Sequence, residues 1–309
     1  MRITNGMMIS NMIRNLGNNQ ERLSKYQNQL DTGKKISVPS DDPVVAARAL
    51  KLRTDVAKVE QYQKNLGDAE SWLDATDEAL SKLGEVLHRG RELSVQAANG
   101  TNTPEETQKI GAELKQLRLQ AVQLANSTYA GRYIFSGFKT DQKLINDDEN
   151  SVDFGKFAIS VDNVNEKIFY EIGVGDSINI NAAGGDLFNN TGDAAAGNVP
   201  SMIQMLNDVI ADMDAGNYDG ITQKLEDFDR EMNNTLRIRA DIGARQNRVE
   251  LSTDRMSNDY INYTDLMSKN EDVDVAETIM NLKNEENVYQ ASLAGGARII
   301  QQTLVDFLR

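Results

Sequence analysis

Apolar residues recur at every seventh position near the N-terminus, as Ile9, Leu16, Leu23 and Leu30, and Met12 lies three places after the first of them. This spacing predicts a helix that is apolar along one narrow side, as in a coiled coil. Because so narrow a stripe cannot bury its own side chains, the helix requires a partner.

A second narrow stripe lies at the other end of the chain. Its apolar residues follow at three- and four-residue spacing, with an extra step near Gly295-Gly296 where we expect the seam to loosen. They are Val275, Ile279, Leu282, Tyr289, Leu293, Ala297, Ile300, Leu304 and Phe307. We expect the two stripes to pair with each other and with neighbouring copies, which indicates an assembly subunit.

The first helix is interrupted by Pro39 and Pro43, because proline is not tolerated inside a helix. Asp42 suits the N-cap of a second helix, and Pro43 suits its first position. From Pro43 to about Ala98 the seven-residue spacing is unbroken, through Val45, Leu52, Val59, Leu66, Leu73, Leu80 and Leu87. We therefore expect one helix of roughly 80 Å.

Further helices are expected on both sides of the middle region. Thr103 and Glu106 have the spacing of a capping box, and the helix that they open is expected to end near Tyr129. Helical spacing returns at Pro200 for a short helix and over residues 221–267 for a second long one. Asp274 is expected to begin the final helix.

The middle of the chain loses the helical period. Segments 133–135, 157–161, 168–172 and 178–180 are rich in β-branched and aromatic residues and are separated by Gly, Asn and Asp, which predicts short strands with turns. Residues 182–197 have low complexity and are expected to form a loop. The fold class is therefore mainly α: a long helical rod or coiled-coil bundle of N- and C-terminal arms, with a small inserted β-rich domain.

These patterns divide the chain into five segments. Residues 1–42 form an N-terminal coiled-coil polymerisation segment with its linker, and 274–309 form the C-terminal polymerisation helix. Residues 43–130 and 200–273 form the two arms of a helical shaft. Residues 131–199 form the β-rich outer domain.

Composition supports thin helices over a compact globule. Aromatic residues make up 6% of the 309 residues, and the formal net charge is -14. Such an acidic chain lacks the clustered Lys and Arg of a nucleic-acid surface. It contains no cysteine, no apolar run long enough to span a membrane, and no apolar core of a secretory signal peptide. Taken alone, these features favour the cytoplasm.

Candidate chemistry is sparse. His88 is the only histidine and lies on a predicted helix without a nucleophile nearby, and Asp74 and Asp77 fall on the polar side of the same helix. We therefore expect no catalytic, cofactor-binding or metal-binding residues and no enzymatic activity. Asn19 is a polar residue within the N-terminal stripe, where it could fix the register of the pairing.

Several motifs resemble a known family. The segment QLDTGKKISVPSDDPVVAARAL (29–50) resembles the N-terminal signature of flagellin-like proteins. The opening MRIT, TYAGRYIFSGFKT (128–140), ADIGARQNRVE (240–250) and SLAGGARIIQQTLVDFLR (292–309) resemble the flagellar hook-associated protein 3 family, the FlgL junction proteins. The resemblance covers both helical arms but not residues 140–200.

The resemblance implies a bacterial subunit that joins the hook to the flagellin filament. Its implied partners are other copies of itself, hook-associated protein 1, flagellin and an export chaperone of the FlgN type. It also implies an extracellular location, reached by type III export without a cleaved signal peptide. The residues expected to carry assembly are Ile9, Met12, Leu16, Leu23, Leu30, Ile279, Leu282, Tyr289, Leu293, Ile300, Leu304 and Phe307.

Three alternatives remain at this stage. The chain could be flagellin itself, which would form a long filament alone. It could be an unrelated cytoplasmic coiled-coil adaptor, which would never be found outside the cell. An enzyme is the weakest alternative, because no group of residues suggests a reaction.

Overall fold

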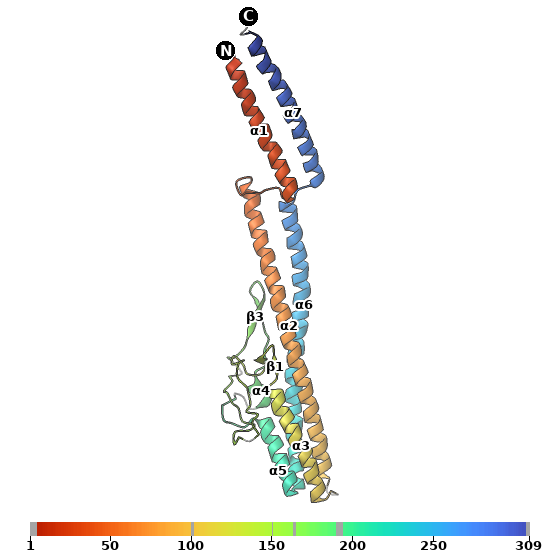
Figure 1. Cartoon of the computed structure of the whole chain (residues 1–309). Coiled ribbons are helices and arrows are strands. Elements are labelled where there is room, and N and C mark those ends of the chain that lie inside the picture. The colour runs from red at the N-terminus through yellow and green to blue at the C-terminus, as the bar shows by residue number, and fades with distance from the viewer. Residues whose placement is uncertain (1–4, 100–101, 150, 163–164, 190–193, 307–309) are drawn as a thin grey trace. The chain divides into compact units, whose positions relative to one another are not determined.

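The computed structural model describes residues 5–99, 102–149, 151–162, 165–189 and 194–306, with side chains described for these residues except 5 and 298–306. Within these ranges the fold is mainly α, as the sequence predicts (Figure 1). The helices are α1 (Asn5–Thr32), α2 (Pro43–Ala98), α3 (Pro104–Ala125), α4 (Gly184–Phe188), α5 (Ser201–Ala215), α6 (Tyr218–Glu271) and α7 (Val275–Asp306).

The strands are short and form two antiparallel pairs. Strand β1 (Thr128–Tyr129) pairs with β2 (Arg132–Tyr133), and β3 (Phe169–Gly173) pairs with β4 (Asp176–Asn179). The expected strand over residues 157–161 is wrong. That segment makes only isolated bridges, in which Phe157 pairs with Ile145 and Val161 with Ala194.

The chain divides into two compact units. The first comprises Met1–Lys58 and Asn258–Arg309, and the second comprises Val59–Ser257. Helices α1 and α7 therefore belong to the first unit, whereas α3, α4, α5 and the strands belong to the second. Helices α2 and α6 contribute to both units. The five-segment division expected from the sequence stays a prediction.

The core of the second unit lies along the predicted heptad series of α2. Leu66, Leu73, Leu80 and Leu87 are fully buried there. From α6, Phe228, Ile242 and Val249 are buried as well, and ion pairs such as Arg239–Asp77 link the two helices at their edges. The repeat thus predicts which face of α2 is buried.

Local signals set the ends of the helices. The Asp42 carboxylate accepts hydrogen bonds from the Val44 and Val45 amides at the start of α2. Thr103 and Glu106 form the predicted capping box of α3. This helix ends at Ala125, so the expected end near Tyr129 is wrong. The side chain of Asn126 turns the chain there by hydrogen bonding to the backbone of residues 144 and 145.

The low-complexity segment 182–197 is not simply a loop, because it contains α4. Phe188 of this helix is buried and packs edge-on against Phe135, with ring centroids 5.8 Å apart. A Cβ atom added to Gly184 would lie 2.8 Å from the Phe135 carbonyl oxygen. Glycine is required there by close packing, which composition alone does not reveal.

Candidate self-assembly interface

Helices α1 and α7 run antiparallel and side by side in the first unit (Figure 1). Their shared seam is polar near its middle. Asn19, which is 7% exposed, donates from Nδ2 to Ser292 Oγ at 2.9 Å. Arg22 donates to Asn19 Oδ1 at 2.6 Å and, through Nε, to Glu285 Oε1 at 3.0 Å. Residues more than 260 positions apart are thus joined by side-chain hydrogen bonds.

The helices approach closely at Gly296. A Cβ atom built there would lie 2.5 Å from Met12 Cε and 2.8 Å from Met12 Sδ. Helix α7 continues through Gly295 and Gly296 without a break. The missing side chain therefore makes space for Met12 of α1, which lies against the α7 backbone.

The predicted assembly residues lie at different depths in this pair. On α1, Ile9, Met12, Leu16, Leu23 and Leu30 are all half-buried. On α7, Leu282 and Tyr289 are half-buried, whereas Ile279 and Leu293 are each 46% exposed. The side chains of Ile300 and Leu304, and the whole of Phe307, lie outside the described residues.

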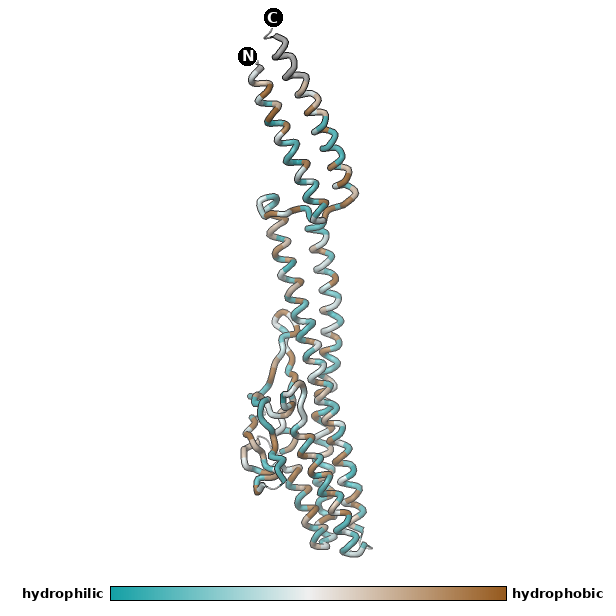
Figure 2. The backbone as a smooth tube through the Cα atoms, in the orientation of Figure 1, coloured by the Kyte–Doolittle hydropathy of each residue, from teal (hydrophilic) through white to brown (hydrophobic). Residues whose placement is uncertain are grey.

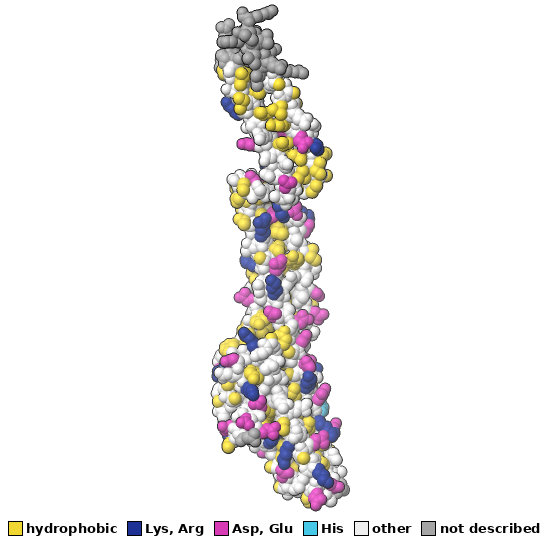
Figure 3. Space-filling view, viewed as in Figure 1, with side chains coloured by type: hydrophobic (Ala, Val, Ile, Leu, Met, Phe, Trp, Pro, Cys, Tyr) yellow, Lys and Arg dark blue, Asp and Glu magenta, His cyan; other side chains and the backbone are white. Residues whose placement is uncertain are grey.

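The terminal pair buries little apolar surface. Among the described side chains, no hydrophobic residue of α1 or α7 is buried, and the first unit contributes only Ala46, Ala49 and Val56 to the buried hydrophobic set. Brown and teal stretches alternate along both helices in Figure 2, and Figure 3 shows yellow apolar side chains gathered over them at the surface. The exposed large apolar residues of the pair are Met7, Met8, Ile13, Val275, Ile279, Met280, Val288 and Leu293.

A groove runs between the two helices beside the close approach. It has a volume of about 420 Å³. Met8, Asn11, Met12 and Asn15 line it from α1, and Ser292, Gly295 and Gly296 line it from α7. The two glycines contribute no side chains to the groove, which leaves room for an apolar side chain of another helix.

The linkers at the base of the pair are bound to each other. Lys34 and Asp272 form an isolated antiparallel bridge, and the Lys35 amide donates to the Glu271 carbonyl oxygen at 2.6 Å. The Glu271 carboxylate, only 2% exposed, accepts two hydrogen bonds from Arg53 and lies 3.4 Å from Lys34 Nζ. The pKa of Glu271 is lowered, mainly by hydrogen bonding from Arg53, so the carboxylate stays charged.

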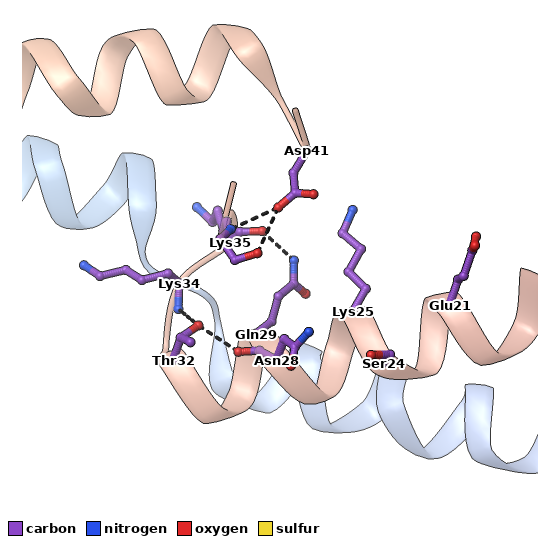
Figure 4. Close-up of a pocket in the computed structure, with 10 residues that line it drawn as sticks. Glu21, Ser24, Lys25, Asn28, Gln29, Thr32, Lys34, Lys35 and Asp41 are labelled. Atoms are coloured by element: carbon purple, nitrogen blue, oxygen red, sulfur yellow. Dashed lines mark hydrogen bonds between the residues drawn. The ribbon is translucent and has the colours of Figure 1, made fainter. Parts of the chain in front are cut away.

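The face of this linker region is hollowed. Figure 4 shows the depression between α1 and the linker, where Gln29 donates to the Lys35 carbonyl oxygen at 2.7 Å. Asp41 accepts hydrogen bonds from the Ser37 and Val38 amides. These hydrogen bonds lower the pKa of Asp41, and the bond from the Val38 amide has the largest effect. The hydrogen bonds made by Gln29 and Asp41 hold the linker in place.

Searches for other kinds of site give few results within the described residues. No cluster of three or more potential metal-ligating side chains is found there. None of the described helices is long and apolar enough to cross a membrane. His88 is exposed on α2.

Both ends of the chain match family descriptions. The bacterial flagellin N-terminal helical region matches residues 3–140, and the bacterial flagellin C-terminal helical region matches residues 225–308. The N-terminal match contains α1, α2 and α3, and the C-terminal match contains α7. The terminal pair described above is thus formed by the two matched regions.

Full-length relatives are also found. The chain is 30% identical over 312 residues to flagellar hook-associated protein 3 of Escherichia coli (strain K12), covering 94% of this chain and 95% of that one. It is 28% identical to flagellin of Bacillus subtilis (strain 168), covering 98% and 97%. The crystal structure of Bacillus cereus FlgL is similar in fold, with a TM-score of 0.56, 22% identity, and coverage of 71% of this chain and 99% of that one.

Proposed function

The chain belongs to the flagellar hook-associated protein 3 family, and we propose that it is a structural subunit that joins the hook of the bacterial flagellum to the flagellin filament. It works by assembling with other proteins of the flagellum, and we assign it no catalytic role. The proposal places it outside the cell after type III export, with a FlgN-type chaperone as its partner before export. In the flagellum its neighbours are hook-associated protein 1, flagellin and further copies of itself.

One observation carries the assembly part of this proposal: α1 and α7 pair with each other and still leave their apolar residues open. An isolated helical pair gains most of its stability from burying an apolar face. Here that face is half-buried at best among the described side chains, with Ile279 and Leu293 the most open of the predicted positions. A second copy of the same chain is the occupant that we propose, because a ring of copies presents the same stripes to each other.

The contact residues of this interface are a proposal as well. On α1 they are Ile9, Met12, Leu16, Leu23 and Leu30, the apolar stripe of that helix. On α7 they are Ile279, Leu282, Tyr289, Leu293, Ile300 and Leu304, and Phe307 follows in the sequence. Ile279 and Leu293 are each 46% exposed, and covering them would stabilise the assembly by about 25 cal/mol for each Å² of apolar area buried.

Two variants test the interface. Ile279→Asp and Leu293→Asp each place a charge on the open stripe, so the variant should be exported yet fail to hold filaments on the hook, with loss of motility. Val174→Asp is the matched control, because Val174 is 90% exposed in the second unit and should tolerate the charge. Normal filaments on cells that carry either stripe variant would contradict the interface.

A tagged copy tests the junction role separately. Electron microscopy of labelled flagella should place it at one short zone between hook and filament. Label along the whole filament would support flagellin instead, which the similarity to the Bacillus subtilis protein keeps as the second candidate. Label found only inside the cell would support a cytoplasmic coiled-coil adaptor.

A further inference from the structure

The apolar repeat of α1 does not by itself specify how α1 aligns with α7. Ile9, Leu16, Leu23 and Leu30 are spaced by seven residues, so a slip of seven residues places each of them where another had been. Apolar contacts would change little after such a slip. The observed alignment of α1 with α7 can therefore be favoured over a shifted one only by contacts of residues that do not recur every seven positions.

Two such contacts lie in the seam. The first is polar: Asn19 is the polar member of its series, with Met12 and Tyr26 seven residues on either side, and it bonds to Ser292. The second is steric, where Met12 occupies the space left by the absent side chain of Gly296. A slip of one heptad brings Tyr289 opposite Met12. The Met12 side chain could shift to make room for one methyl group, but a phenol ring in the same space would clash with it.

The polar contact extends to a charge. Glu285 Oε1 accepts from Arg22, while Glu285 Oε2 is buried without a hydrogen-bond partner among the described residues. The same slip removes Arg22 from Glu285 and brings it opposite Thr278. A carboxylate that is already partly desolvated would then lose its cation, which is costly.

We propose that Asn19, Ser292 and Gly296 fix a single register between α1 and α7, with the Arg22–Glu285 pair as support. The residues that specify the alignment are therefore polar or small, and the apolar residues of both helices, half-buried or exposed in the single chain, can be covered by other copies. The use of this register in the junction rests on the proposed function, but the register itself is a property of one chain.

Disulfide trapping in the purified full-length chain tests this. The protein has no cysteine, so introduced pairs report without background. The pair Tyr26→Cys with Leu282→Cys, two heptads from the Met12–Gly296 contact, reports the native register, and Tyr26→Cys with Val275→Cys reports the slipped one. Each pair is measured in the parent background, in Asn19→Leu/Ser292→Leu, and in Asn18→Leu, where Asn18 is exposed on the same helix.

In the parent and in Asn18→Leu, the intrachain 26–282 disulfide should form and the 26–275 disulfide should not. In Asn19→Leu/Ser292→Leu the ratio of 26–275 to 26–282 product should rise about tenfold, the order expected for losing one buried polar pairing. Both new side chains are apolar, so helix content by circular dichroism should stay equal or increase, which separates slippage from unfolding.

An unchanged ratio in the double variant would overturn the proposal, and so would an equal rise in Asn18→Leu. Neither result depends on flagella. A chain with a fixed register that never enters the hook–filament junction would instead contradict the proposed function alone.

Discussion

Arg53 of α2 holds the carboxylate of Glu271, at the end of α6, with two hydrogen bonds of 2.7 Å each. Both residues belong to the first unit. The guanidinium is half in solvent, whereas the carboxylate is closed off from it. This pair, with Lys34, ties the linker after α1 to the linker before α7.

Arg53→Met should loosen the linkers. It leaves the buried Glu271 carboxylate with Lys34 as its remaining cation, which we expect to cost about 1–2 kcal/mol after allowance for the exposed arginine. Hydrogen exchange at the Lys35 and Val273 amides should become roughly tenfold faster, because both donate across the linkers. Lys82→Met is the control, since its pair with Glu78 is exposed on both sides. Equal protection in Arg53→Met and the parent would rule this role out.

A second buried carboxylate, Glu231 of α6, lies in the second unit at the end of α4. Its Oε1 accepts from Ser201 Oγ at 3.1 Å, and its Oε2 has no hydrogen-bond partner among the described residues. Ser201 Oγ also lies 3.2 Å from the Phe188 carbonyl oxygen. Burial, only partly offset by Ser201 and Arg230 and slightly reinforced by Asp227, raises the pKa of Glu231 to about 7.

The stability of the second unit should therefore fall as pH rises from about 4.5 to 7. The folded protein keeps a proton that the unfolded chain releases, so the stabilisation is complete at low pH and is lost through the folded pKa. The difference corresponds to about 3 kcal/mol. Thermal unfolding between pH 5 and 8.5 should show this slope, and Glu231→Gln should remove it. Glu226→Gln, which changes an exposed carboxylate on the same helix, should keep it.

Two glycines should respond to alanine in opposite directions. Gly184→Ala forces a methyl group toward the Phe135 carbonyl oxygen and should destabilise the second unit by about 1–3 kcal/mol. Gly67→Ala lies inside α2, where no described atom apart from the neighbouring helix backbone is within 4 Å of the new Cβ, and it should stabilise the unit by roughly 0.5–1 kcal/mol. Urea unfolding of the two variants measures both. Equal effects would show that the α4 contact is not tight.

The terminal helices should exchange their amide hydrogens faster than the second unit in the isolated chain. No described hydrophobic side chain of α1 or α7 is buried, whereas α2 has fully buried leucines from Leu66 to Leu87. Helices without such burial are marginal in water. The amide hydrogens of residues 6–32 and 275–297 should exchange at least tenfold faster than those of residues 66–87. Comparable protection would contradict this expectation.

Much of the fold follows from local pattern. The heptad series of α2, the proline and aspartate at its start, and the Thr103–Glu106 box each act through neighbours in sequence, so the chain itself reveals them. Features that depend on distant packing are not visible in this way. In the sequence, Gly184 belongs to a low-complexity segment, although the Phe135 carbonyl oxygen lies too close to it for any side chain.

The terminal pair was partly predictable for the same reason. The stripes indicate that two helices pair, and Asn19 marks a polar position in one of them. Hydrophobic spacing gives no weight to Glu285 or Ser292, so it does not reveal that these residues form hydrogen bonds with α1. Glu231 was missed entirely, because burial by α4 and α5 leaves no signal in its own sequence neighbourhood.

The bridge between Lys34 and Asp272 has a consequence for how the ends of the chain find each other. Asn19 and Ser292 are separated by 273 positions, and closing so long a loop is entropically unfavourable. Once the linkers are joined, α1 and α7 begin from a common base, so their pairing resembles the zipping of a short hairpin. By the logarithmic dependence on loop length, this reduces the entropic cost of pairing by about 2 kcal/mol.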